Sequence, residues 1–277
     1  MIFFAISVWY YCSMDFDYIL ADPTGNITVL VTTPYTDETR DAMIRESFRR
    51  EPSCEQVGFI MPVSDDVIRL EMMGYEFCGN ATLSAAAWHA YTHGLKEGCE
   101  THVSVDSSGT DRILDVRISR LAASAGHPSF EGTVSMPVPA VTTFRGRPLV
   151  RFSGISHLIV PAGSLTEDEA ETLVKEIAGE LDVPAMGLLL CPEYDSLVSP
   201  DPLSGSISIR PLVYVPCSQT LFWEQGCATG STAVGWFRST LSGSSDHTEI
   251  KQPGGIIRVD VAGGQPYLTG RVTLLSL

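Results

Sequence analysis

Basic residues are scarce in this 277-residue chain: 18 lysines and arginines stand against 33 acids, which gives a formal net charge of −15. This acidic balance argues against nucleic acid or an anionic membrane surface as the main partner. The three lysines, Lys96, Lys175 and Lys251, offer no convincing pyridoxal phosphate site. The sequence also lacks a P-loop and any metal-ligand spacing. We therefore expect a small-molecule partner and no cofactor or metal.

The seven cysteines include no CxxC pair, which argues against a zinc knuckle. Their odd number and wide spacing do not suit a disulfide framework, so we expect a reducing, cytoplasmic environment. Residues 1–12 are apolar but too short to span a bilayer, and they lack the features of a secretory signal. We interpret residues 1–13 as an added strand or as an over-extended start, with Met14 as the alternative start. A homodimer is kept as a candidate assembly.

The chain is long enough for one large domain or two ordinary ones, and 44% of its residues are hydrophobic. Residue patterns predict helices over 37–49, 79–91, 229–240 and a stretch that opens at a capping box at 164–167. Strands are predicted over 27–33, 56–63, 67–72, 102–106, 112–118, 131–136, within 149–161, and over 206–215, 219–223, 256–261 and 267–275. The two halves repeat this plan, which predicts pseudo-twofold symmetry with a cleft between the halves.

A proline-rich link at Pro137-Val138-Pro139 marks the expected domain boundary. The first domain then covers residues 1–137, to which the segment 266–277 returns, and the second covers residues 138–265. Each half contains a central run of small residues, at 79–91 and at 229–240. The first of these runs lacks charge, so we expect a helix that is buried on all sides.

Two short segments place a cysteine directly before small residues that begin a helix-like run. They are Phe77-Cys78-Gly79-Asn80-Ala81-Thr82 and Gly226-Cys227-Ala228-Thr229-Gly230-Ser231. The unpaired N–H groups of a first helical turn and the positive end of the helix dipole stabilise a thiolate. We therefore expect Cys78 and Cys227 to be acidic thiols that work as a pair.

A pair of thiols suits the inversion of an amino acid. That reaction needs a base on one face of the α-carbon and an acid on the other, and a thiolate and a thiol can exchange these roles. Two helix N-termini that converge on the α-carboxylate would stabilise the carbanion. Small residues allow this close approach to the backbone, and the expected contacts are Gly79, Asn80, Ala228, Thr229 and Gly230.

Three other readings of the cysteines stay open. A buried cysteine before a helix is usually a small hydrophobe, although two with such flanks argue against that reading. A nucleophilic cysteine hydrolase would need a histidine base, for which His157 is the attractive candidate. A protein that binds a small molecule without proton chemistry is the non-catalytic alternative, and the retention of both cysteines counts against it.

At these residues the sequence resembles the diaminopimelate epimerase-like superfamily of cofactor-independent racemases and epimerases. The segment Phe77-Cys78-Gly79-Asn80 is specific to the superfamily. Cys54-Glu55-Gln56-Val57-Gly58-Phe59-Ile60 and Gln252-Pro253-Gly254-Gly255 point to one branch, the histidine racemases of nicotianamine-like (staphylopine-type) metallophore pathways. The other matching segments are 23–26, 211–216 and 223–227, in the same order along the chain.

The resemblance implies an α/β (α+β) fold of two halves, each a barrel-like sheet around a central helix, with the active site between them. It implies interconversion of L- and D-histidine without pyridoxal phosphate or metal, with Cys78 and Cys227 as base and acid, in supply of a metallophore pathway. Asn26 and Asn80 match the substrate-contacting asparagines of the family. Glu55 matches an acid that receives the substrate amine or imidazole, and a solvated loop carboxylate is the alternative.

The chain departs from diaminopimelate epimerases just before the second cysteine. Those enzymes carry a Glu-Arg pair that holds the distal amino-acid group, and Ser218 and Gln219 stand there instead. Without that arginine a second substrate carboxylate has no partner, so we expect histidine rather than a diamino diacid as substrate, with Gln219 among the substrate contacts. A diaminopimelate epimerase or a broad-specificity racemase is the closest enzyme alternative. His157 and Glu224 are interpreted as structural residues.

Overall fold

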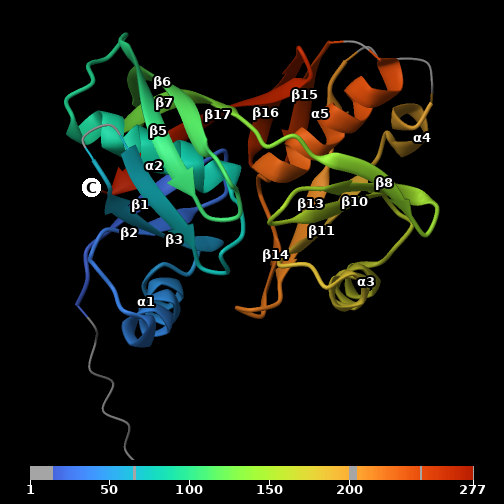
Figure 1. Cartoon of the computed structure of the whole chain (residues 1–277), viewed down its shortest axis with the longest axis horizontal. Helices are drawn as coiled ribbons and strands as arrows, with labels where there is room; N and C mark the ends of the chain where they lie inside the picture. Colours follow the sequence, from blue (N-terminus) through green and yellow to red (C-terminus); the bar gives the residue numbers. More distant parts are fainter. Residues whose placement is uncertain (1–14, 65–66, 200–204, 244, 277) are drawn as a thin grey trace, which may run out of the picture.

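The computed structural model describes residues 15–64, 67–199, 205–243 and 245–276. The predicted extra strand or extended start at residues 1–13 lies outside the described residues. Figure 1 shows two lobes side by side, with the helices α2 (Gly79–Thr92) and α5 (Ala228–Ser242) inside them. The helices α1 (Asp37–Arg50) and α3 (Glu167–Leu181) lie on the outside. This mixed α/β architecture, which is mostly sheet, confirms the predicted fold class.

The first lobe is a closed sheet around α2. Its strands are β1 (Tyr18–Pro23), β2 (Thr28–Val31), β3 (Gln56–Pro62), β4 (Val67–Met72), β5 (Glu100–Ser107), β6 (Ile113–Ser124), β7 (His127–Ser135) and β17 (Gln265–Ser276). They pair in this order, and antiparallel pairing of β1 with β17 closes the ring. Helix α2 is the crossover between the parallel strands β4 and β5.

Helix α2 is buried because the strands of the first lobe surround it. A Cβ at Gly132 of β7 would lie 2.8 Å from Leu83 Cδ2, so the strand glycine makes room for that helix side chain. Leu83 is 1% exposed and belongs to a core that includes Leu70, Phe130 and Val134. The prediction of a helix buried on all sides holds for residues 79–87, whereas Trp88, His89 and Tyr91 near its end are half-buried. The burial of its first turns fixes the position of the cysteine that precedes it.

The second lobe surrounds α5 with two sheets. From β17 the first sheet continues through β16 (Gly255–Ala262), β15 (Asp246–Gln252) and β12 (Ile207–Ser208). The other sheet has the order β14 (Thr220–Trp223), β13 (Arg210–Val215), β11 (Met186–Cys191), β10 (Ser156–Pro161), β9 (Arg147–Arg151) and β8 (Ala140–Phe144). Helix α5 packs against β15, β16, β9 and β10, and the short helix α4 (Tyr194–Leu197) follows β11.

The predicted helices are present, and the differences concern caps and strands. Helix α3 begins after Thr166, whose capping-box partner is Glu169, and not in the box predicted at 164–167. Strands β8, β11 and β15 were not predicted. Strand β11 is buried at every residue and reads as a continuous apolar run, so it lacks the alternation that marks a half-exposed strand.

The returning segment at the end of the chain is strand β17, which pairs with β1, β7 and β16. The domain boundary at residue 137 stays a prediction. None of the helices in the described part of the chain combines the length and the apolar character that crossing a membrane needs.

Candidate active site

The two predicted cysteines occupy the same position at the start of the two central helices. Cys78 is the N-cap of α2, and its sulfur accepts a hydrogen bond from Ala81 N at 3.4 Å. Cys227 is the N-cap of α5, and its sulfur accepts from Gly230 N, also at 3.4 Å. A sulfur in this position replaces the oxygen that usually caps a helix. Both thiols therefore lie at the positive ends of helix dipoles.

The N-termini of the two helices approach each other closely. A Cβ at Gly79 would lie 2.8 Å from Ala228 Cβ, so a residue larger than glycine would force the helices apart. Asn80 Nδ2 donates a hydrogen bond of 2.6 Å to the Gly226 carbonyl of the other lobe. This contact and the close approach of Gly79 to Ala228 join the starts of the two helices.

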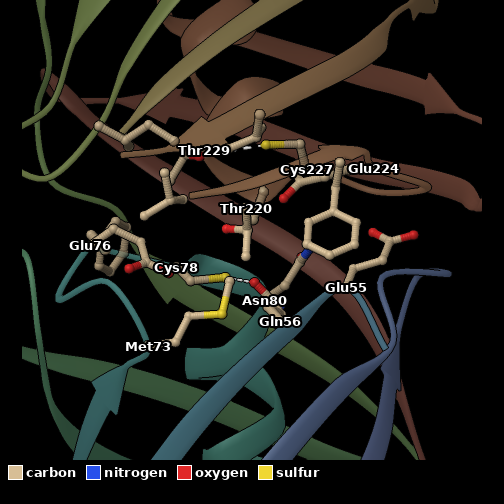
Figure 2. A pocket seen from close by; sticks show the side chains of 16 residues that line it. Glu55, Gln56, Met73, Glu76, Cys78, Asn80, Thr220, Glu224, Cys227 and Thr229 are labelled. Carbon is tan, nitrogen blue, oxygen red and sulfur yellow. Dashed lines mark hydrogen bonds between the residues drawn. The ribbon is translucent and has the colours of Figure 1, made fainter. Parts of the chain in front are cut away.

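A pocket lies between these helix ends (Figure 2). Its lining consists of three carboxyls, six apolar side chains and seven other residues: Glu55, Glu76, Glu224; Met73, Phe77, Ile155, Val213, Val215, Phe222; Gln56, Cys78, Asn80, Thr220, Cys227, Ala228 and Thr229. Figure 2 shows the sulfurs of Cys78 and Cys227 on opposite sides of this pocket. Two thiols on opposite sides can act on opposite faces of one carbon atom.

A chain of side-chain hydrogen bonds leads away from Cys78. The Cys78 thiol donates to Gln56 Oε1 at 3.0 Å, and Gln56 Nε2 donates to Asn26 Oδ1. Asn26 Nδ2 then donates to Glu55 Oε2 at 2.6 Å. Glu55 in turn accepts from the backbone N–H of Gln225 in the other lobe, at 3.3 Å to each oxygen. This network links the first thiol to the contact between the lobes.

Cys227 has different neighbours. Its sulfur lies 3.6 Å from Thr229 Oγ1, which lies 2.9 Å from His157 Nε2. Its backbone N–H donates to Gln252 Oε1 at 2.6 Å, and the Glu224 carboxyl lines the same pocket. His157 is fully buried, and burial lowers the pKa of its imidazole to about 3. The ring is therefore neutral and cannot serve as the charged partner of a nucleophilic cysteine.

Similar proteins place this site in a family. A family model described as the histidine racemase CntK N-terminal domain matches residues 15–270. The chain belongs to this histidine racemase family. It is 29% identical to a histidine racemase of Fusobacterium nucleatum subsp. nucleatum, over 94% of this chain and 95% of that protein. It is 28% identical to a histidine racemase of Staphylococcus aureus strain Mu50, over 92% and 93% of the two chains.

Among solved structures, a predicted epimerase from Pseudomonas aeruginosa is similar in fold. The TM-score is 0.65 at 15% sequence identity, over 95% of this chain and 98% of that one. The resemblance to the histidine racemase family is thereby confirmed, and with it the classification of the chain as an isomerase of the racemase type.

The thiols of this racemase are not acidic in the structure, contrary to expectation. Burial raises the pKa of Cys78 to about 12, although Ala81 N–H donates a hydrogen bond to its sulfur. Burial also raises the pKa of Cys227, and the neighbouring Glu224 carboxylate adds to the rise. Loss of water around the sulfurs outweighs the helix dipoles. Forming a thiolate here therefore requires a nearby group that can take or compensate a proton.

Two of the three carboxyls, Glu55 and Glu224, are also partly protonated near neutral pH. Burial raises the pKa of Glu55 to about 7 and that of Glu224 to about 8. Burial raises the pKa of Glu76 as well, and its carboxylate accepts from Gly74 N at 2.8 Å. Glu224 was interpreted as a structural acid, but it lines the pocket together with both cysteines.

The predicted site residues fall into three groups. Those that line the pocket are Cys78, Cys227, Glu55, Asn80, Ala228 and Thr229. Asn26, Gly79 and Gly230 lie directly behind the lining: Asn26 bonds to Glu55, Gly79 begins α2, and Gly230 N bonds to the Cys227 sulfur. Gln219 is outside the pocket, in the turn between β13 and β14, with a positive φ of 54°. Its neighbour Thr220 lines the pocket instead.

Gln56 is the main residue of the site that was not predicted from the sequence. It lines the pocket and bonds to Cys78, and the signal for it was its place next to Glu55 in a family motif. Phe222 also lines the pocket, whereas the next residue, Trp223, bonds to Glu171 through Nε1. Within the ranges that the structure describes, no group of three or more His, Cys, Asp or Glu side chains is arranged to hold a metal ion.

Proposed function

We propose that this racemase interconverts L- and D-histidine by a two-base mechanism in which Cys78 and Cys227 act on opposite faces of the α-carbon. The observation that carries this proposal is the pair of thiols, each the N-cap of a central helix, on opposite sides of one pocket. One sulfur removes the α-proton while the other delivers a proton to the opposite face. Each turnover therefore exchanges the roles of the two sulfurs.

The α-carboxylate fits the space where the two helices meet. First-turn N–H groups of α2 and α5 converge there, and the helix dipoles favour a negative charge. Negative charge grows on the carboxylate as the α-proton leaves, so these fixed donors stabilise the transition state more than the substrate. The protein's own backbone thus supplies the electrostatic stabilisation of the carbanion.

The charge of the pocket favours a substrate with a basic or neutral side chain. Three carboxyls line the pocket, and none of its described lining residues is a lysine, arginine or histidine. Glu55 is the candidate acceptor for the amine or the imidazole of the substrate, because its carboxyl lies in the lining and is held by Asn26. A second substrate carboxylate would meet like charge and no cationic partner. These features favour histidine over a diamino diacid.

The structure has the two lobes closed over the pocket. The free volume inside is about 30 Å³, which is space for one or two water molecules and far less than a histidine needs. At its rim Phe48 of α1 stacks on Phe222 of β14, with ring centroids 5.8 Å apart. A Cβ at Gly74 would collide with Val215 of the other lobe. We propose that substrate enters when these contacts open and that closure excludes water from the reaction.

We place the reaction in the cytoplasm, since the cysteines in the described residues are all free thiols. We also propose that D-histidine supplies a metallophore pathway, as the family resemblance implies.

A substrate panel analysed by chiral chromatography tests the activity. We expect histidine to be racemised and diaminopimelate to be a poor substrate. Cys99→Ser, at an exposed thiol away from the pocket, is the matched control for the cysteine variants. Faster turnover of diaminopimelate than of histidine would contradict the proposed substrate.

A further inference from the structure

The orientation of the Gln56 side chain is determined by its surroundings. Asn26 Nδ2 donates to Glu55, so Asn26 Oδ1 is the end of that amide that faces Gln56. Thr28 Oγ1 uses its proton on the backbone carbonyl of Asn26. Both oxygens therefore accept, and Gln56 must present its NH₂ group to them. Its carbonyl oxygen Oε1 then faces the Cys78 sulfur at 3.0 Å.

This orientation selects one protonation state of Cys78. An amide oxygen can only accept a hydrogen bond, so a thiol fits against it, whereas a thiolate would place its negative charge against the oxygen lone pairs. The Gln56 amide cannot turn without breaking its bonds to Asn26 and Thr28. Cys78 is consequently held as the proton donor of the pair.

A buried glutamine also lies beside the second cysteine, but it binds different atoms. Gln252 Oε1 accepts from the backbone N–H of Cys227, and Gln252 Nε2 donates to Ser231 Oγ at 2.8 Å. Neither end of this amide contacts the Cys227 thiol in these bonds. The sulfur instead meets the N–H of Gly230 and the hydroxyl of Thr229.

The hydroxyl of Thr229 is oriented by His157. Nδ1 of this buried ring has no hydrogen-bond partner and faces the Cα of Gly187, where any side chain would collide with the ring. A buried N–H without a partner is rarer than an unpaired acceptor, so the ring proton belongs on Nε2. Nε2–H then donates to Thr229 Oγ1, which leaves the Thr229 proton free to point at the Cys227 sulfur.

The charged groups around the sulfurs are all carboxyls. Glu224 lines the pocket with Cys227, and its carboxylate raises the pKa of that thiol. Glu76 and Glu224 both act electrostatically on Cys78, but the hydrogen bond of that thiol goes to the neutral Gln56 amide. Carboxyls thus act on both thiols, and the hydrogen-bond partners of each sulfur decide the difference between them.

From these contacts we infer that Cys227 loses its proton more readily than Cys78, which is held as the thiol, with Gln56 and the Thr229–His157 pair as the positioning residues. This inference rests on the two-cysteine mechanism proposed above. The Cys227 thiolate forms an S–H bond with the α-proton of one enantiomer, and the electron pair of the broken C–H bond stays on the α-carbon. Cys78 then gives its proton to the opposite face and becomes the thiolate. Reverse turnover, or proton exchange with water in the open enzyme, restores the resting state.

Alkylation of the whole chain by iodoacetamide across a pH series, with peptide mapping, tests this assignment without any substrate. We expect the apparent pKa of Cys227 to lie at least one unit below that of Cys78, which is about a tenfold difference in thiolate fraction. Gln56→Met removes the acceptor of the Cys78 thiol. The alkylation rate of Cys78 at neutral pH should therefore rise about threefold to tenfold, while the alkylation rate of Cys227 stays unchanged. Gln252→Met, the matched control, should leave the Cys78 profile unchanged.

Thr229→Val supplies an independent test on the other thiol. It replaces the hydroxyl by a methyl group of similar size, which cannot donate to the Cys227 sulfur. The alkylation rate of Cys227 at neutral pH should therefore fall several-fold, while the alkylation rate of Cys78 stays unchanged. Ionisation of Cys78 at the same or a lower pH than Cys227 would overturn the assignment, as would a Cys78 profile that Gln56→Met does not move. Because no substrate is present, these outcomes are independent of whether the protein racemises histidine.

Discussion

The starts of helices α2 and α5 are alike in backbone and different in chemistry. In both, a cysteine caps the helix and its sulfur accepts the N–H three residues later at 3.4 Å. Beside α2 a glutamine binds the thiol itself, whereas beside α5 a glutamine binds the backbone N–H of the cysteine and the Ser231 hydroxyl. Two cysteines in equivalent positions at helix starts can thus have different hydrogen-bond partners. The neighbours of each sulfur decide the difference.

The largest effect is expected when either of the two thiols is removed. Cys78→Ser and Cys227→Ser should each lower racemisation of histidine by about 10²–10⁴-fold, since a serine hydroxyl is too weak an acid and base to replace either thiol. Chiral chromatography of histidine measures the loss, with Cys99→Ser as the control. Near-normal turnover by either variant would rule out a mechanism that needs both sulfurs.

Substitution of the two glutamines should affect different properties, kcat for Gln56 and stability for Gln252. Gln56→Met should reduce kcat by about tenfold because it frees the Cys78 thiol from its fixed acceptor. Gln252→Met should act mainly on folding, with a loss of about 1–3 kcal/mol in the free energy of unfolding, because it leaves the buried N–H of Cys227 unpaired. Steady-state kinetics and urea unfolding of both variants separate these effects. Equal effects of the two changes on kcat would show that the glutamines are equivalent.

Glu224 makes the second lobe sensitive to pH. Burial raises its pKa to about 8, so the folded protein binds this proton more tightly than the unfolded chain does. The resulting stabilisation is present below the ordinary carboxyl pKa and is lost as the pH rises through about 8. Glu224→Gln cannot ionise, so its free energy of unfolding should gain about 1–3 kcal/mol relative to the wild type between pH 5 and pH 9. Urea unfolding at both pH values measures this gain, and parallel pH curves would contradict it.

The smallest effect is expected at Glu55, which joins the lobes and faces the substrate. Glu55→Gln keeps the shape of the side chain and can still bond to the Gln225 N–H, but it loses the charge that attracts a cationic group. We expect KM for histidine to rise several-fold with a smaller change in kcat. A KM that stays the same would assign Glu55 to the contact between the lobes alone.

Much of the site was predictable because its residues carry local signals. The small-residue runs after Cys78 and Cys227 predict buried helices, and both helices are present at nearly the predicted bounds. The pairing of the two cysteines followed from the same pattern in each half. Strand β11 was not predicted because burial on both faces removes the alternation of apolar and polar residues that marks a half-exposed strand.

The properties that were not predictable depend on contacts between distant segments. The role of Gln56 appears only when β3 and the start of α2 lie side by side, 22 residues apart in the chain. The acidity expected for the thiols was wrong because their burial arises from the meeting of both lobes, which the helix dipole does not outweigh. Gln219 lies in a turn outside the pocket lining, whereas its neighbour Thr220 lines the pocket.

Histidine racemisation in D₂O tests the central claim of two sulfurs on one α-carbon most directly. With two bases, the product enantiomer should carry solvent deuterium at Cα from the first turnovers, while the remaining substrate keeps its original hydrogen. Proton NMR combined with chiral separation reads both pools, starting from L- and then from D-histidine. Exchange into the remaining substrate as fast as product forms would contradict the account, because one base would then serve both faces.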